Sequence, residues 1–514
     1  MTDSETGKAD APFDDSSVEP GVWRYAKASR ASVIVDAADY FALMLQAMLK
    51  AQRRIMLIAW DFDTRIHLAH GRRWWQRPWK RQCPQRLGSF ILWLGRHRPD
   101  LEIRILKWGL GFLKFFGRGS MLLDIARWWP HERIDFKFDT HHPLGCSHHQ
   151  KIAVIDDKLA VCGGIDMTTE RWDTREHVED EPQRKTPGGH RYCPWHDATM
   201  MLEGEVAGAL GELGRDRWRR AGGLPLDPVD YDGDSAWPDE LEAQFTDVEV
   251  GIARTRAKYC GDEGIDEIAR LFEQQIARAR KFIYAESQYF ASRIVAEAIC
   301  KRLGEDDPPE IVIVHAETAE DFIERKAMDT ARVRLVNGLQ EADKHGRLQF
   351  FVPYTGETPI YCHAKIMIVD DELLRIGSAN FNNRSMGLDS ECDVFIDCAR
   401  PANSHCGPAI RALRHSLLAE HLCLEPEEVG PLLEQHGSMA AMVAALGTDR
   451  PRSLRRLAVE HLTDLEQGLA DSELLDPETP DEMFDFVQAR RGLFRRRGLL
   501  SRAMVRWRRK NGNR

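Results

Sequence analysis

Two short segments of the chain combine a histidine, a lysine and an aspartate at the same spacing. One segment reads HQKIAVID from His149 to Asp156, and the other reads HAKIMIVD from His363 to Asp370. In both, six further residues lead to a glycine that begins the sequence GGID or GSAN. A doubled pattern with a matching downstream segment is too specific to be accidental, so both copies are candidates for chemistry.

Side chains two residues apart on a strand point to the same face, so each histidine shares a face with a lysine. The pairs are His149 with Lys151 and His363 with Lys365. Two imidazoles and two ammonium groups around one anion suit a phosphodiester. One imidazole can attack phosphorus, the other can protonate the leaving alkoxide, and the lysines can stabilise the developing negative charge.

The aspartate of each segment, Asp156 or Asp370, has the opposite parity along the strand. Each begins a polar turn, with the sequence DDK in the first copy and DDE in the second. We therefore predict a structural role for both aspartates.

The chemistry of the two segments needs no metal ion. The chain also contains no HExxH motif, no EF-hand loop and no Walker lysine loop. We therefore predict neither a metal site nor a cofactor.

The elements around the two segments recur in the same order. A helical pattern from Phe41 to Leu49 leads into the apolar run Ile55 to Trp60, and Ile268 to Ile276 leads into Phe282 to Ala285 in the same way. Two further strand-like runs match in order, 101–108 with 311–316 and 134–138 with 348–352. Strands that alternate with helices predict an α/β fold in each copy.

Changes in composition along the chain indicate its domain boundaries. The stretch from Leu224 to Asp239 is rich in Pro, Asp and Gly, which is typical of a linker, and helical patterns dominate after residue 400. The predicted organisation is a polar N-terminal segment at 1–30, a first repeat at 31–223, a linker with the start of the second half at 224–255, a second repeat at 256–400, a helical extension at 401–489 and a basic tail at 490–514. For the helical extension we expect a packing role.

Composition indicates a globular protein with a sizeable core. The chain has 514 residues, 43% of them hydrophobic, and no apolar run near the 20 residues or so that span a bilayer. No secretory signal is recognisable, and eleven cysteines without a CxxC pair suggest a reducing compartment. We expect a cytoplasmic protein that is peripheral at the membrane, although secretion without a cleavable signal is compatible with the same sequence.

The charge of the chain indicates which binding partners it favours. The net charge of -10 argues against a nucleic acid as a specific partner. Two basic segments rich in tryptophan or apolar residues, Arg72 to Arg81 and Arg490 to Arg514, are candidates for contact with a membrane surface. A solvated loop and a disordered cationic tail are the corresponding alternatives.

The paired motifs resemble those of the phospholipase D superfamily. The wider flanks RWDT from Arg171, PWHD from Pro194 and ESQYF from Glu286 resemble its eukaryotic-type, phosphatidylcholine-hydrolysing branch, and the resemblance covers roughly Val33 to Cys398. It implies two similar α/β/α sandwich domains in a pseudo-twofold arrangement, with one active site between them. A monomer is then sufficient for activity.

The resemblance also implies roles for the site residues. His149 is assigned as the nucleophile that becomes a phosphohistidine and His363 as the general acid, although the near-symmetry of the site leaves their order open. Asp197 and Glu391 match the acidic residues that orient the histidines. Candidates for binding the phosphoryl oxygens or other parts of the substrate are Lys151, Lys365, Asn380, Ser378, Gly164, Asp166, Trp172, Trp195 and Tyr289. Both tryptophans are equally compatible with a place in the core, and the role of Asp166 is open because Asn380 stands at its position in the second copy.

The predicted function is phospholipase D activity, which releases phosphatidic acid and a free head-group alcohol, with phosphatidyl transfer to alcohols as a side reaction. The alternatives are a transferase such as a cardiolipin synthase, a nuclease with the same motifs, or a lipid-binding protein without catalysis. Intact His and Lys in both copies argue against the last of these.

Overall fold

A computed structural model of the chain describes residues 19–69, 83–109, 119–318 and 322–457, with side chains left out for 322–330. The predicted membrane-contact segment from Arg72 to Arg81 and the basic tail from Arg490 to Arg514 lie outside these residues. So do most of the N-terminal segment and the second part of the predicted helical extension.

Seven strands of the first copy pair in the order β4-β3-β2-β5-β6-β8-β1. Strands β2, β3 and β4 are parallel, and the other pairings are antiparallel. The strands are β1 (Arg24–Val35), β2 (Arg54–Ala59), β3 (Glu102–Trp108), β4 (Ile134–Asp139), β5 (Ile152–Ile155), β6 (Leu159–Gly163) and β8 (Ala198–Glu203).

The second copy repeats this order as β13-β12-β11-β16-β17-β18-β9. The two copies join where β1 pairs antiparallel with β9, so the pairings run without a break from β4 to β13. The strands are β9 (Phe245–Arg256), β11 (Phe282–Ser287), β12 (Glu310–His315), β13 (Leu348–Thr355), β16 (Ile366–Val369), β17 (Leu373–Gly377) and β18 (Glu391–Asp397). The matching order confirms the predicted pseudo-twofold α/β architecture.

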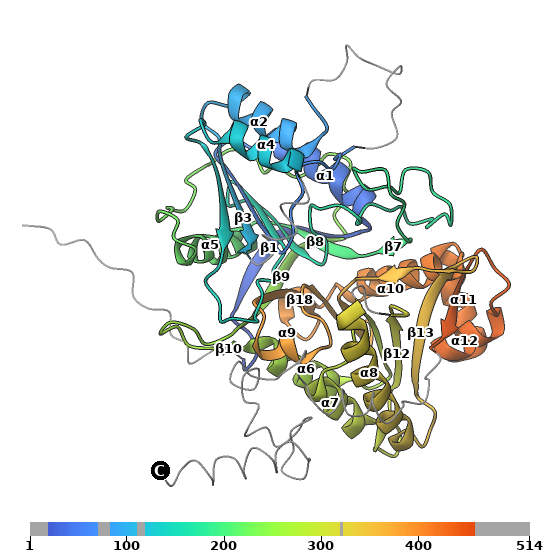
Figure 1. The fold of residues 1–514 in the computed structure, drawn as a ribbon. Coiled ribbons are helices and arrows are strands. Elements are labelled where there is room, and N and C mark those ends of the chain that lie inside the picture. Colours follow the sequence, from blue (N-terminus) through green and yellow to red (C-terminus); the bar gives the residue numbers. More distant parts are fainter. Residues whose placement is uncertain (1–18, 70–82, 110–118, 319–321, 458–514) are drawn as a thin grey trace, which may run out of the picture.

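Helices cover the outer face of each copy, at opposite ends of the molecule (Figure 1). The first copy carries α1 (Ala37–Lys50), α2 (Leu87–His97) and α4 (Gly119–Trp128), and α5 (Glu205–Arg220) packs on its other face. The second copy carries α6 (Glu267–Arg278), α7 (Arg293–Leu303), α8 (Phe322–Ala342) and the short α9 (Asn383–Gly387). Residues 221–244, which contain the predicted linker, form neither helix nor strand.

The apolar strand runs are explained by burial on both faces. On β2, Ile55 and Leu57 pack against the outer helices, whereas Met56 and Ile58 enter a central core. That central core also contains residues of the second copy, such as Val312 on β12. Strands buried on both sides read as continuous hydrophobic runs rather than as an alternation.

The part of the extension that the structure describes contains helices and one unexpected strand. The helices are α10 (Gly407–Leu422), α11 (Pro426–His436) and α12 (Met439–Leu446), and β19 (Arg452–Arg456) pairs antiparallel with β13. The sequence of β19, RSLRR, gives little apolar signal because Leu454 is the one residue of the strand that enters the central core. Short pairings complete the fold: β10 (Ile265–Asp266) with β9, β14 (Thr358–Pro359) with β13, and β7 (Trp195–His196) with β15 (Tyr361–Cys362).

Both motif aspartates fasten the turn that leads from a helix into the neighbouring strand. Asp156 accepts hydrogen bonds of 2.7–2.8 Å from the backbone N–H groups of residues 52–54, and Asp370 does the same for residues 280–282. Both residues have positive φ, 54° and 56°, in the tight turns between β5 and β6 and between β16 and β17. These contacts agree with the structural role that strand parity indicated.

We predict that Asp156→Ala lowers the free energy of unfolding by about 1–3 kcal/mol, because three backbone donors lose their acceptor. Urea denaturation followed by circular dichroism measures the change. Glu273→Ala is the matched control, since Glu273 is exposed on α6. Equal midpoints for the two variants would contradict the role of Asp156.

Candidate active site

Main-chain pairing between the copies sets the position of each motif histidine. The N–H of His149 donates to the carbonyl of Ser390 at 2.9 Å, and the N–H of His363 donates to the carbonyl of His196 at 2.7 Å. The segment before His363 also pairs through β15 with β7 of the first copy. Each histidine is therefore attached to the copy to which it does not belong in sequence.

The carboxylates that hold the histidines are exchanged in the same way. Nδ1 of His149 lies 3.0 Å from both carboxylate oxygens of Glu391, and Nδ1 of His363 lies 2.6 Å from Oδ2 of Asp197. A proton on Nδ1 that donates to the carboxylate leaves Nε2 with its lone pair free for chemistry. The structure thus pairs both predicted acids with a histidine, across the domain boundary.

Glu391 is held by two hydroxyl groups, whereas a glycine leaves room for Asp197. The hydroxyls of Ser378 and Ser385 donate to the two oxygens of Glu391. Gly164 stands where Ser378 stands in the second copy, and a Cβ there would lie 2.0 Å from Oδ1 of Asp197. Ser378 is fully buried and holds Glu391, Gly164 leaves room for Asp197, and a contact of either residue with substrate stays a prediction.

The lysines adopt matching positions with different partners. Nζ of Lys151 donates to the carbonyl of His149 at 2.8 Å and lies 3.5 Å from Oδ2 of Asp166. Nζ of Lys365 donates to the carbonyl of His363 and lies 3.4 Å from Oε1 of Gln288. Lys151 therefore has a carboxylate beside it, whereas the equivalent position near Lys365 is the neutral Asn380.

Asn380 is buried, yet its Oδ1 accepts no hydrogen bond. A buried polar atom without a partner is costly, and the cost falls when a ligand supplies one. An amide oxygen accepts hydrogen bonds and so does a phosphoryl oxygen, so contact with a phosphoryl group would need the amide N–H of Asn380 and stays a prediction. Asp166, by contrast, accepts a hydrogen bond from the N–H of Trp60 at 3.1 Å, so part of its capacity serves the fold.

Burial lowers the pKa of both motif histidines well below the usual value, and the nearby lysines lower it further. Burial also raises the pKa of Asp197 to about 7 and that of Glu391 to about 8. The lysines thus disfavour a charged imidazole.

The predicted aromatic contacts divide into two groups. Trp195 is only 2% exposed, stacks on Tyr361 with the ring centres 4.6 Å apart, and carries the guanidinium of Arg171 over its ring at 4.0 Å. Its ring lies 5.1 Å from that of His363, so it packs beside the site, and a contact with a head group stays a prediction. Tyr289 is more accessible, and its hydroxyl accepts a hydrogen bond of 2.8 Å from Gln288.

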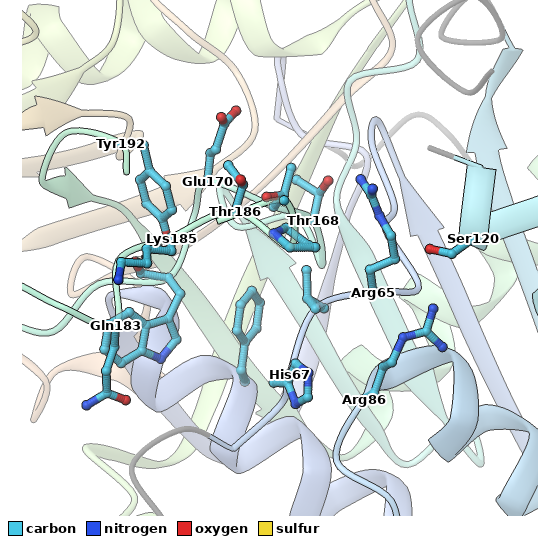
Figure 2. Close-up of a pocket in the computed structure, with 16 residues that line it drawn as sticks. Arg65, His67, Arg86, Ser120, Thr168, Glu170, Gln183, Lys185, Thr186 and Tyr192 are labelled. Atoms are coloured by element: carbon cyan, nitrogen blue, oxygen red, sulfur yellow. Dashed lines mark hydrogen bonds between the residues drawn. The ribbon is translucent and has the colours of Figure 1, made fainter. Parts of the chain in front are cut away.

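Trp172 lines a separate pocket of about 510 Å³ in the first copy (Figure 2). Basic side chains of Arg65, Arg86 and Lys185 lie around this pocket, together with the ring of Tyr192. The motif histidines do not line it. A role for Trp172 in substrate binding stays a prediction.

Sequence reasoning missed two groups close to the site. Arg171 belongs to the RWDT segment and Gln288 to the ESQYF segment, but the sequence indicated no role for either residue. In the structure, Gln288 links Lys365 to the hydroxyls of Tyr289 and Tyr361. Directly behind Asp197 lies a buried cluster whose members come from distant parts of the chain, Asp36, His177, His196 and Glu420. Only His196 belonged to a motif, so no local signal could have gathered this cluster.

Comparison of the sequence with known proteins finds similarity to phospholipase D. The family model described as phospholipase D matches residues 342–464. The chain is 27% identical over 398 residues to "Phospholipase D alpha 1" of Nicotiana tabacum, and 27% identical over 397 residues to the protein of the same name from Arabidopsis thaliana. These matches cover 54% of this chain and 49% of each relative.

The chain is thus similar to proteins of the phospholipase D superfamily. The crystal structure of phosphatidylserine synthase from Haemophilus influenzae Rd KW20 shares the fold, with a TM-score of 0.50 and 13% identity over 81% of this chain and 94% of that one. The chain spans about half the length of the curated plant relatives that it matches. Among its described helices, none has both the length and the apolar character needed to cross a bilayer.

We predict that Gly164→Ala lowers turnover by about 10²-fold, because the added methyl group displaces the Asp197 carboxylate and with it the ring of His363. The rate of hydrolysis of bis(p-nitrophenyl) phosphate measures the loss, with a thermal melt to check folding. Gly208→Ala on α5 is the control, since its Cβ would meet nothing closer than 3.7 Å. Unchanged turnover in a folded Gly164→Ala protein would refute the positioning role of Asp197.

Proposed function

We propose that this protein is a phospholipase D, which hydrolyses the distal phosphodiester bond of a glycerophospholipid at a membrane surface. The observation that carries the proposal is the pair of exchanged contacts, His149 with Glu391 and His363 with Asp197. Two imidazoles with fixed Nδ1 atoms, each next to a lysine, supply a nucleophile and an acid for one phosphoryl group.

In the first step, Nε2 of His149 attacks phosphorus and a P–N bond forms. The bond from phosphorus to the head-group oxygen breaks, and the departing alkoxide takes a proton from His363. We assign His149 as the nucleophile by resemblance. The greater exposure of its side chain, 13% against 5% for His363, is compatible with that order.

In the second step, His363 removes a proton from water, and the water oxygen attacks phosphorus. The P–N bond breaks, its electron pair returns to His149, and phosphatidic acid is released. Glu391 and Asp197 stabilise whichever imidazole carries the charge, while Lys151, Lys365 and Asn380 are suited to the non-bridging oxygens.

A phospholipid substrate is supported by the names of the plant relatives and by the sequence flanks outside the two motifs. The net charge of -10 weighs against nucleic acid. Mass spectrometry of products from a mixed lipid extract, with single-stranded and duplex DNA in parallel, tests the substrate class. Cleaved DNA with an intact lipid extract would overturn the proposal.

We predict that His149→Ala and His363→Ala each abolish turnover of a short-chain phosphatidylcholine while leaving the thermal melt close to that of the wild type. Loss of a general acid alone costs about 10²- to 10⁴-fold. His141→Ala is the control, since this partly exposed histidine contacts Asp262 rather than the site. Near-normal turnover in either motif variant would contradict the shared site.

We predict that 1-butanol is converted to phosphatidylbutanol at the expense of phosphatidic acid, because a covalent intermediate does not distinguish strictly between water and a small alcohol. The product ratio should rise with butanol concentration while head-group release continues. Hydrolysis of a substrate with a chiral phosphorus should retain configuration, since two in-line displacements each invert it. Net inversion would exclude the phosphohistidine.

A further inference from the structure

The cluster behind Asp197 has the composition and geometry of a metal site. Its four members come from the turn before α1, the loop after β6, strand β7 and helix α10. None of them is more than 5% exposed, and their ligand atoms all lie within 4.8 Å of one another. The members are Asp36, His177, His196 and Glu420.

Two distances within the cluster are close to the edges of a tetrahedron around an ion, and two are shorter. Nε2 of His177 lies 3.5 Å from Oδ2 of Asp36 and 3.1 Å from Oε1 of Glu420. Nδ1 of His196 lies 3.4 Å from Oδ1 of Asp36 and 2.8 Å from Oε1 of Glu420. Bonds of about 2.0–2.2 Å to a zinc ion place tetrahedral ligand atoms about 3.3–3.6 Å apart. The four side chains need only small shifts to reach this geometry.

The second nitrogen of each histidine is held by a carboxylate. Nδ1 of His177 lies 3.0 Å from Asp173, and Nε2 of His196 lies 2.7 Å from Glu286. Histidines that bind metals almost always donate their other ring N–H in this way, which fixes the tautomer and aims the lone pair at the ion. Both lone pairs are then directed into the cluster.

One oxygen of the cluster accepts no hydrogen bond. Asp36 is 1% exposed and its Oδ1 accepts from the N–H of Asp197 at 3.1 Å, but its Oδ2 has no donor. This oxygen lies 3.5 Å from Nε2 of His177. A carboxylate oxygen buried in this way is a natural ligand for a cation.

Charge also requires a positive group at this place. The carboxylates of Asp36, Asp173, Glu286 and Glu420 carry four negative charges, and the guanidiniums paired with two of them carry two positive charges. These are Arg184, paired with Asp173, and Arg175, paired with Glu420. The remaining two negative charges are balanced by one divalent ion or by a second proton on each histidine.

We propose that Asp36, His177, His196 and Glu420 bind one divalent transition-metal ion, of which zinc fits the ligand set best. Imidazole ligands disfavour calcium and magnesium, which prefer oxygen alone. An ion with four protein ligands, and no coordination position left for water or substrate, is typical of a structural site. The ion would tie α10 to the first copy and hold His196 next to Asp197, without taking part in the chemistry at phosphorus.

The test begins with the metal content of the full chain, purified without chelators from zinc-supplemented cells. We expect about one zinc per chain by mass spectrometry, and an X-ray absorption spectrum with two imidazole and two oxygen ligands at about 2.0–2.2 Å. Refolding with Co²⁺ in place of zinc should give the intense visible bands of a tetrahedral site. A chain without metal and without these bands would overturn the proposal in favour of two charged imidazoles.

Variants separate this cluster from other metal-binding groups. His177→Gln and Glu420→Gln should lose the metal and melt at a lower temperature, and added zinc should not restore either property. His315→Gln is the matched control, because His315 is also buried but contacts Ala316 and Arg332 in the second copy. Zinc retained at full occupancy in a folded His177→Gln protein would refute the site, whatever the outcome of the lipid assays.

Discussion

The exchange of histidine–carboxylate pairs between the two copies is the contact on which this site depends. His149 is oriented by Glu391 of the second copy, and His363 is oriented by Asp197 of the first. Neither copy alone can present an imidazole with a fixed Nδ1. The β1–β9 pairing and the shared central core are therefore conditions for the chemistry, because they keep each carboxylate within hydrogen-bond distance of its histidine.

The duplication is close but not symmetric, and the differences lie where a division of labour would require them. Asp166 compensates the charge of Lys151, whereas Asn380 stands at the same place in the second copy. Ser378 donates to its carboxylate, while Gly164 only leaves room for one. In the proposed mechanism one imidazole acts as nucleophile and the other as acid.

The C-terminal helices take part in the organisation of the site. Helix α10 carries Glu420 into contact with His177 and His196, directly behind the pair formed by Asp197 and His363. The expectation of a simple packing role is therefore too narrow for this region. Charges buried as deeply as these are tolerated only when they are paired or bound to an ion, so the helix and the two copies constrain one another.

The sequence by itself determined the features that depend on local pattern. The two HxKxxxxD segments predicted the reactive side chains, strand parity separated the lysines from the structural aspartates, and the repeated order of helices and strands predicted two α/β copies. The resemblance pointed to Asp197 and Glu391 as orienting acids. Each of these inferences rests on residues that are neighbours in the chain or repeat at a fixed offset.

Only the tertiary structure decided which groups meet across the chain. It exchanged the carboxylates between the copies, stacked Trp195 on Tyr361 and added the charged strand β19 to β13. It also gathered Asp36, His177, His196 and Glu420 at one point. The physical reason is that these contacts join residues as far as 384 positions apart, from Asp36 to Glu420. No periodicity or spacing within a segment encodes them, because they arise only when two sheets and a helix pack together.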